Sequence, residues 1–220
     1  MSFEELRTYI NTLRRESSDK PLDEQHVCSN PLEQFALWYE ESVNTQALET
    51  NAMTLATVSE IGYPSTRIIY MRDIDENGVI FYTNYNSQKA KEIINNPAVS
   101  LLFFWAELER QVRIFGRALK VPEKISDEYF ASRPRESQIG AWSSDQSAEI
   151  EGRSTLIEKF EYYSEKFKDL DVPRPENWGG FQVIPEKFEF WQGRPNRLHD
   201  RILYLKSNEA DEWTISRLAP

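Results

Sequence analysis

Alternation of apolar and polar residues runs through most of the chain after Asn51, and this period of two is the strongest limit on its fold. Successive side chains of a β-strand point to opposite faces, whereas an amphipathic helix repeats its apolar positions every three or four residues. Short turns, such as the one at 75–78, separate these segments, which favours an antiparallel sheet or barrel. The expected strands cover residues 52–59, 64–73, 79–83, 98–105, 109–121, 178–184, 187–192, 201–206 and 212–218.

Helical segments are expected before and between these strands. Ser2 and Glu5 form a capping box for a first helix, and Asn30 caps a second helix that has Pro31 at its first position. The expected helices cover about 3–15, 31–48, 87–96, 122–132 and much of 135–169. The predicted fold class is therefore α+β, with an antiparallel sheet or barrel and peripheral helices, in a single domain over 1–220.

The composition indicates in which cellular compartment such a chain would be found. Its longest apolar run, at 99–106, has a strand's length and falls far short of the ~20 residues of a membrane-spanning helix. The N-terminal residues are charged and carry no hydrophobic signal segment. The single cysteine, Cys28, suits a reducing compartment. A cytoplasmic protein without membrane association is therefore expected.

The charge distribution narrows the class of ligand. A formal net charge of −10 and a pI near 4.9 argue against a nucleic-acid-binding surface. Arginine is nevertheless concentrated in several short segments, which favours a small anionic ligand over a polymer. Arginines paired with surface glutamates would give the same pattern. His26 and Cys28 have no third or fourth ligand nearby in the sequence, so no metal site is predicted.

The segment 188–204 holds the densest group of functional side chains. It begins as a strand, breaks at Gly193 and Pro195, and resumes as a strand near Arg201. One explanation is a basic surface loop that covers a core tryptophan, Trp191. The other is a site for an anionic, planar small molecule, because guanidinium groups bind phosphate and stack on flat rings. The break contains Arg194, Arg197, His199, Asp200 and Arg201.

A possible phosphate site lies where an expected strand meets the next helix. Tyr82 and Thr83 end the strand, and Ser87 and Lys89 open the helix. Unpaired N–H groups and the positive end of the helix dipole favour an anion at such a place. An ordinary helix cap with a solvated lysine fits the same residues equally well.

Tyr129, Arg133 and Ser137 form a second candidate phosphate site. The first two are four residues apart on an expected helix and share a face. Two hydroxyls around a guanidinium would suit a phosphate, whereas a core tyrosine beside a surface arginine is the alternative.

Three other side chains could contact a ligand. Gln111 could pair with the imide edge of a flat heterocycle, or lie on a solvated strand face. Arg67 and Arg72 would point to opposite faces of a regular strand, so two ligand contacts there require a bulge or two different ligands. Because no glycine-rich phosphate loop or nucleophile elbow is present, a cofactor would have to supply the chemistry of an enzyme.

Several motifs occur in a characteristic order: RIIYMR, FYTN with SQKA, ERQVRIFG, YFASRPRESQIGAWSSDQS, WGGF and FWQGRPNRLHDR. Together they resemble the pyridoxamine 5′-phosphate oxidase family, from about Asn51 to the terminal RLAP and more loosely before it. The resemblance implies an antiparallel, FMN-binding split β-barrel with peripheral helices over 49–220. It also implies a helical arm over 1–48 that packs on or over the site, and a homodimer with FMN held between the subunits.

The resemblance also implies two sets of site residues. The FMN set consists of Arg67, Ile68, Arg72, Tyr82, Thr83, Ser87, Gln88, Lys89, Gln111, Gln146, Ser147, Trp191 and Arg201. The substrate set consists of Arg14, Ser17, Arg72, Tyr129, Arg133, Ser137, Arg197 and His199. Within the second set, Arg197 and His199 are the expected catalytic residues.

The implied activity is oxidation of pyridoxamine 5′-phosphate or pyridoxine 5′-phosphate to pyridoxal 5′-phosphate. Hydride would pass from the substrate C4′ carbon to flavin N5, and O2 would reoxidise the flavin and form hydrogen peroxide. Arg197 would hold the substrate ring, and His199 would either orient the reacting group or accept a proton. Positive charge from Arg201 would stabilise the reduced flavin.

Three positions depart from the family pattern. Arg72 stands where lysine is usual, Gln88 where arginine is usual, and Ser17 where tyrosine is usual. Gln88 removes a charge from the expected FMN phosphate site, and Ser17 removes an aromatic ring from the arm. The departures at positions 17 and 72 motivate one alternative, a split-barrel flavin oxidase with a different small substrate. A non-catalytic flavin or pyridoxal-phosphate binding protein is the other alternative.

Overall fold

The structure, a computed structural model, describes residues 7, 21–207 and 212–220. Contacts between Cα atoms group the chain into two units, each of which is treated by itself. Unit 1 comprises residues 1–48, 104–112 and 189–220, and unit 2 comprises 49–103 and 113–188. The expected first helix lies outside the described residues except for residue 7. The prediction of one domain with an arm over 1–48 stays a prediction.

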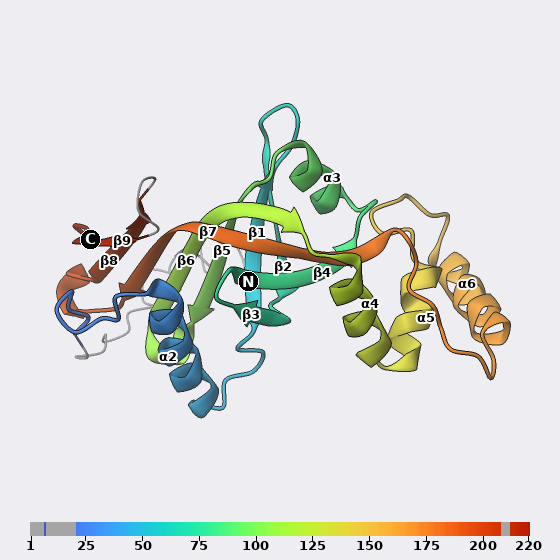
Figure 1. The fold of residues 1–220 in the computed structure, drawn as a ribbon, viewed down its shortest axis with the longest axis horizontal. Helices are drawn as coiled ribbons and strands as arrows, with labels where there is room; N and C mark the ends of the chain where they lie inside the picture. The colour runs from blue at the N-terminus through green and yellow to red at the C-terminus, as the bar shows by residue number, and fades with distance from the viewer. Residues whose placement is uncertain (1–6, 8–20, 208–211) are drawn as a thin grey trace. The chain divides into compact units, whose positions relative to one another are not determined.

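The described strands form a sheet whose neighbours follow the order β2-β1-β5-β6-β7-β4-β3, with β8 paired to β7 and β9 (Figure 1). The pairs β1–β2, β1–β5, β3–β4, β4–β7 and β8–β9 are antiparallel. This arrangement confirms the predicted fold class of an antiparallel sheet with helices around it. The strands are β1 Ala52–Val58, β2 Pro64–Tyr70, β3 Asp73–Asp75, β4 Gly78–Asn84, β5 Ala98–Trp105, β6 Arg110–Lys120, β7 Trp178–Gln192, β8 Asp200–Lys206 and β9 Trp213–Arg217.

Unit 2 contains the helices α3 Gln88–Asn95, α4 Glu123–Ser132, α5 Arg135–Ser143 and α6 Arg153–Lys166. Strand β1 alternates between buried and half-buried residues, as its sequence period predicts. An apolar cluster forms around Trp178 at the start of β7 and takes in Phe130 of α4, Ile139 of α5 and Phe167. Figure 1 shows α5 beside α6. This cluster holds the helices that carry part of the candidate site.

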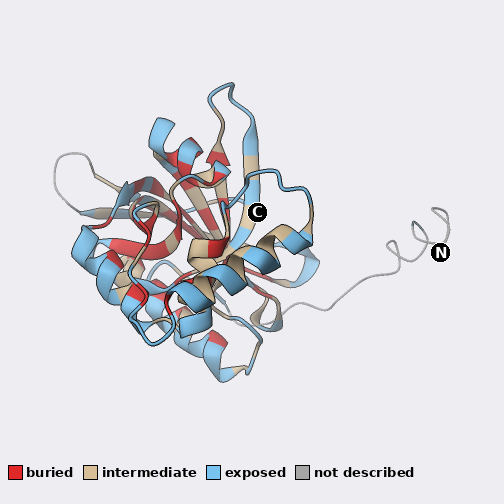
Figure 2. Cartoon of the chain, turned by 90° about the vertical axis from the view of Figure 1, so that its right-hand side faces the viewer, coloured by how far each residue is buried: buried red, intermediate tan, exposed pale blue. Residues whose placement is uncertain are grey.

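Unit 1 contains α2 Pro31–Asn44, and its N-cap is the one expected from the sequence. The side chain of Asn30 accepts a hydrogen bond from the backbone N–H of Leu32. The buried face of α2 presents Trp38, whose ring meets that of Phe190 edge-on with 5.2 Å between centroids. The buried residues, red in Figure 2, lie mostly along strands, while the helices carry long exposed stretches.

Element boundaries differ from the predictions where a proline or a loop intervenes. Residues 178–192 form one strand, β7, although two strands were expected, over 178–184 and 187–192. The expected strand over 64–73 is divided into β2 and β3, with Arg72 between them. The helical pattern over 135–169 is divided into α5 and α6, and α2 ends at Asn44. Across the described part of the chain, no helix combines the length and apolarity needed to cross a membrane.

Candidate functional site

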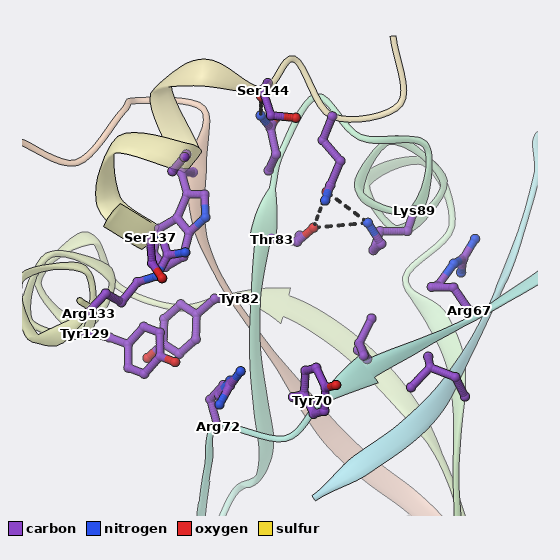
Figure 3. Close-up of a pocket in the computed structure, with 17 residues that line it drawn as sticks. Arg67, Tyr70, Arg72, Tyr82, Thr83, Lys89, Tyr129, Arg133, Ser137 and Ser144 are labelled. Atoms are coloured by element: carbon purple, nitrogen blue, oxygen red, sulfur yellow. Dashed lines mark hydrogen bonds between the residues drawn. The ribbon is translucent and has the colours of Figure 1, made fainter. Parts of the chain in front are cut away.

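A cavity of about 550 Å³ lies in unit 2, among residues from β2, β4, α3, α4 and α5 (Figure 3). Its lining carries cationic side chains toward two ends, one at Lys89 and one at Arg133. Ten residues predicted from the sequence line it: Arg67, Ile68, Arg72, Tyr82, Thr83, Lys89, Tyr129, Arg133, Ser137 and Gln146. The structure therefore brings together residues of both predicted sets.

At the first end, the ammonium group of Lys89 contacts only neutral oxygen atoms among the described residues. Its Nζ lies 3.0 Å from Oε1 of Gln146, 3.3 Å from Oγ1 of Thr83 and 3.4 Å from Oγ of Ser87. Burial lowers the pKa of Lys89, and the charge of Arg67 lowers it further. A partly buried ammonium with neutral partners is well suited to an anion, because its charge is not yet compensated.

The local chain explains the position of Lys89. Strand β4 delivers Thr83, and Ser87 then caps α3, its side chain accepting a hydrogen bond from the N–H of Ala90. The cap starts the helix so that Lys89 lies in its first turn, beside the orphan N–H groups of the helix start. The sequence-based description of this strand–helix junction is thus reproduced, including its cap.

Arg67 occupies the same cavity but has internal partners. Its guanidinium donates to Oγ1 of Thr57 at 2.6 Å and to Oγ of Ser65 at 2.7 Å. Its Nη2 also lies 3.4 Å from Oε2 of Glu92, and its Nη1 lies 3.3 Å from the carbonyl of Leu55. The side chain of Arg67 is therefore held firmly in place by β1, β2 and α3 before any ligand binds.

Glu92 is a buried carboxylate that the sequence analysis missed. It accepts hydrogen bonds from the hydroxyls of Thr57 and Ser65 and from Nε2 of Gln88, the last at 2.9 Å. Burial alone would raise the pKa of Glu92, but these hydrogen bonds and the charge of Arg67 outweigh it and lower the pKa to about 2. A sequence signal existed, since Glu92 follows Gln88 by four positions on the same helix face.

At the second end, three aromatic rings are stacked in parallel. Tyr82 lies 3.8 Å from Tyr129 at 7° and 5.4 Å from Trp178 at 6°, measured between ring centroids. The guanidinium of Arg133 lies 4.7 Å from the ring centroid of Trp178. Its Nη1 is buried and has no hydrogen-bond partner among the described residues. An unpaired buried guanidinium nitrogen is costly, so this end of the cavity suits an anionic ligand.

Arg72 lines the same cavity as Arg67, although the spacing of the two residues predicted opposite faces of a regular strand. Alternation along a strand would have placed the two side chains on opposite faces. Strand β2 ends at Tyr70, however, and the backbone N–H of Arg72 bonds to Ile80 of β4. Arg72 thus lies outside the regular strand, and its guanidinium is 5.0 Å from the ring centroid of Tyr70.

Gln88 and Ser147 line a neighbouring cavity of about 450 Å³ together with Gln146 and Glu92. The N–H of Gln88 donates to Oγ of Ser147 at 3.2 Å, which ties the start of α3 to the loop after α5. Ser147 has a positive φ of 73°, an uncommon conformation for a residue other than glycine. The Gln88 side chain is committed to Glu92, so it does not extend the cationic end of the first cavity.

Unit 1 contains a separate group of predicted residues around His199. Its Nδ1 accepts a hydrogen bond from the backbone N–H of Arg194 at 3.1 Å, and its ring lies 4.6 Å from that of Trp191. Arg197 is exposed and has a φ of 62°, next to Asn196 at 59°. Two successive left-handed residues other than glycine indicate backbone strain, which often marks a functional loop.

The other predicted residues of unit 1 have different surroundings. Arg201 forms an ion pair with Glu189 at 2.9 Å and donates to the carbonyl of Ala219. Glu189 therefore offsets the positive charge of Arg201, which was expected to stabilise the reduced flavin. Gln111 is half-buried on β6. Arg14 and Ser17 lie outside the described residues.

Comparison with known proteins agrees with the motif-based resemblance. The family described as pyridoxamine 5′-phosphate oxidase matches residues 39–167, and the pyridoxine 5′-phosphate oxidase C-terminal dimerisation region matches residues 178–220. A pyridoxine/pyridoxamine 5′-phosphate oxidase of Gloeothece citriformis is 50% identical over 96% of this chain and 98% of its own length. Another, from Paraburkholderia xenovorans, is 50% identical over 97% of this chain and 100% of its own.

Solved structures show the same fold. PhzG from Burkholderia lata, in complex with tetrahydrophenazine-1-carboxylic acid, has a TM-score of 0.86 and 28% identity, covering 93% of this chain and all of its own. A related FMN-binding protein from Nostoc punctiforme has a TM-score of 0.70 at 16% identity, over 88% of this chain and 100% of its own, and supports the fold alone.

The fold is that of the split-barrel oxidoreductases. The chain belongs to the pyridoxamine 5′-phosphate oxidase family. This membership confirms the predicted family and enzyme class, and it supports FMN as the cofactor. The match to the dimerisation region indicates a homodimer.

Proposed function

We propose that this protein catalyses the FMN-dependent oxidation of pyridoxamine 5′-phosphate or pyridoxine 5′-phosphate to pyridoxal 5′-phosphate. The observation that carries the proposal is a single cavity with cationic side chains toward two ends, Lys89 at one and Arg133 at the other. Two phosphorylated aromatic molecules need two such anchors if their rings are to be stacked between them. The curated relatives at 50% identity carry the name of this activity, which supports it further.

The Lys89 end fits the phosphate of FMN. Its ammonium has no carboxylate partner within ion-pair distance among the described residues, and Thr83, Ser87 and Gln146 surround it with groups that can also hydrogen-bond an anion. The start of α3 adds N–H groups and a positive dipole end. Arg67 contributes a second charge from a fixed position. In this proposal Tyr82, Gln88, Ser147, Ile68 and Arg72 complete the cofactor set in unit 2, and Gln111, Trp191 and Arg201 belong to the set by resemblance.

The Arg133 end fits the phosphate of the substrate. The unpaired Nη1 of Arg133 can donate to a phosphate oxygen, and Tyr129 and Ser137 line the same cavity. Burial lowers the pKa of Arg133, which is consistent with a site that gains stability when an anion arrives. Arg72 adds a second guanidinium to the lining. Arg14 and Ser17 belong to this set by resemblance.

The residues of the proposed reaction have distinct tasks. When bound, FMN would supply the two-electron acceptor for a hydride from the substrate C4′ carbon, and O2 would reoxidise it with formation of hydrogen peroxide. Arg197 would bind the pyridine ring through its exposed guanidinium. His199 would donate a hydrogen bond from Nε2, because its Nδ1 already accepts one from the Arg194 backbone. The structure thus favours the orienting role for His199 over the role of a base.

The remaining parts of the proposal rest on the family. FMN is proposed to lie at the interface of a homodimer, in a split barrel over 49–220, with residues 1–48 as an arm on or over the site. The protein is proposed to work in the cytoplasm, which suits its single cysteine.

The visible spectrum of purified protein tests the activity. Loaded with FMN under anaerobic conditions, the protein should lose its yellow colour when pyridoxamine 5′-phosphate is added, and air should restore it with release of hydrogen peroxide. A flavin that binds but is never bleached by either pyridoxine or pyridoxamine phosphate would contradict the proposal.

A second candidate is a split-barrel flavin oxidase with another substrate, and the similarity to PhzG favours it. A reduced phenazine carboxylic acid carries a carboxylate and no phosphate, so the Arg133 end would have to bind the carboxylate instead. Parallel turnover measurements at saturating FMN decide between them. Higher kcat/KM for the phenazine than for either vitamer phosphate would select the second candidate.

A further inference from the structure

We propose that Glu92 is a positioning residue for the FMN phosphate: it fixes Arg67 and limits how tightly the phosphate is held. The inference rests on the proposed function, since it concerns the phosphate end of the same cavity. Nothing in the sequence motifs assigns a role to this residue. Glu92 is buried, with 6% of its surface exposed; it lines the neighbouring cavity of about 450 Å³ and contacts Arg67, which lines the first cavity.

The contacts of Glu92 form a relay to Arg67. The hydroxyls of Thr57 and Ser65 each accept a hydrogen bond from the guanidinium and each donate one to Glu92. Glu92 also approaches the guanidinium directly, at 3.4 Å. The carboxylate of Glu92 therefore orients the side chain of Arg67, which would contact the phosphate, through these two hydroxyls. This orientation does not depend on the ligand.

The same carboxylate changes the charge of the site. Arg67 and Lys89 bring two positive charges, and Glu92 cancels one of them close to where a phosphate dianion would bind. Its charge raises the pKa of Lys89, against the effects of burial and Arg67, so the two groups are electrostatically coupled. Gln88, at the first position of α3, is neutral and so does not replace the positive charge that Glu92 cancels. Its amide donates a hydrogen bond to Glu92.

Replacement of Glu92 by glutamine removes the negative charge of the side chain but keeps its size and its hydrogen bonds. In Glu92→Gln the remaining carbonyl oxygen can still accept from Thr57 and Ser65, and the Gln88 amide can turn to accept from the new amide group. Arg67 then stays oriented while the negative charge disappears. Removing one negative charge about 6 Å from a dianion should tighten FMN binding about tenfold, for a water-like dielectric constant near 80. Riboflavin has the same ring system without the phosphate, so its binding should not change.

The experiment is a titration of apoprotein with FMN and with riboflavin, followed by quenching of flavin fluorescence. The quantity of interest is the ratio of the riboflavin Kd to the FMN Kd. We expect this ratio to rise about tenfold in Glu92→Gln. The matched control is Glu161→Gln, an exposed glutamate on α6 that changes the net charge equally and should leave the ratio unaltered.

The outcomes separate this inference from the proposed function. If wild-type protein binds neither flavin, the proposed function fails. If it binds FMN but the ratio in Glu92→Gln is unchanged or lower, with the far-UV spectrum intact, only the role of Glu92 is overturned. Should Glu92→Gln not fold, Thr57→Val removes one of the two hydroxyls that link Glu92 to Arg67 and should lower the ratio, because Arg67 is then less well oriented. An unchanged ratio in that variant would also overturn the inference.

Discussion

The backbone N–H of Arg194 donates a hydrogen bond to Nδ1 of His199 at 3.1 Å, and this contact defines the tautomer of the imidazole. A backbone N–H can only donate, so Nδ1 carries no proton in the neutral ring and Nε2 carries it. The side chain thus presents a hydrogen-bond donor at Nε2. The neighbouring ring of Trp191, 4.6 Å away, limits how the imidazole can turn.

Substitutions at His199 should reveal this donor. Glutamine can place an amide N–H near the position of Nε2, whereas the shorter asparagine mimics Nδ1 and does not reach as far. We therefore expect His199→Gln to keep about tenfold more kcat than His199→Asn, the value of one hydrogen bond of about 1.4 kcal/mol. Steady-state kinetics with saturating FMN provide the measurement.

The tautomer itself can be observed without any activity. The chain has two histidines, so ¹⁵N-labelled histidine gives two sets of ring signals, and His26→Gln assigns them. In its neutral form, His199 should show a protonated Nε2 and an unprotonated Nδ1. The opposite pattern would mean that the hydrogen bond from Arg194 is absent in solution, and the donor role would be abandoned.

Replacement of Arg133 should weaken binding of the phosphorylated substrate and leave the cofactor in place. Arg133→Met keeps an apolar side chain over Trp178 but removes the guanidinium, whose Nη1 is unpaired in the described structure. A charged hydrogen bond of about 1.5–3 kcal/mol predicts a KM for pyridoxamine 5′-phosphate that is roughly 10- to 100-fold higher. Pyridoxamine without the phosphate serves as the control, because its KM should not respond. An equal rise for both substrates would assign Arg133 to the ring instead.

Glu92 should make the stability of the protein depend on pH in the acid range. Its pKa is lowered to about 2 in the folded chain from an ordinary 4.5, so the unfolded chain binds the proton more readily. The stabilisation is therefore complete above pH 4.5 and is lost as the pH falls toward 2. Relative to Glu92→Gln, wild-type protein should lose on the order of 3 kcal/mol of unfolding free energy between pH 6 and 2. Urea unfolding at a series of pH values measures this difference, and a constant difference would refute the assignment.

Gly116 should be intolerant of a side chain because β6 passes very close to β7 there. A Cβ atom at this position would overlap the carbonyl oxygen of Ile184 and lie 2.9 Å from Cα of Pro185. Both contacts are with backbone, which cannot move aside cheaply, so Gly116→Ala should cost about 2 kcal/mol or more. Gly152→Ala is the control, since its Cβ would lie 3.8 Å from the nearest atom, Oγ of Ser154. Equal melting temperatures for the two variants would contradict the prediction.

Local sequence signals were reliable where the physical cause was itself local. Asn30 and Ser87 cap α2 and α3 as expected, because an N-cap depends on a side chain and the N–H groups two or three residues later. The break expected between residues 184 and 187 was wrong. Strand β7 continues through Pro185, since a proline is tolerated in a strand wherever no partner needs its N–H.

In the candidate site too, local features were predicted from the sequence, whereas contacts between distant segments were not. The motifs around Lys89 and Arg133 predicted two anion sites, and both residues line one cavity. The spacing of Arg67 and Arg72 left their faces open, and only the end of β2 at Tyr70 explains how both reach that cavity. Glu92 was not recognised at all, because its partners Thr57 and Ser65 lie 35 and 27 positions away.

The sequence by itself determined the strand periodicity, the helix caps and the order of motifs that places this chain in its family. These features depend on the residues' own periodicity and nearest neighbours. Only the tertiary structure decided which charges are compensated: Arg67 by Glu92, Arg201 by Glu189, and Lys89 by no carboxylate among the described residues. The reason is that burial and long-range hydrogen bonds set the energy of a charge, and both arise only when distant segments of the chain meet.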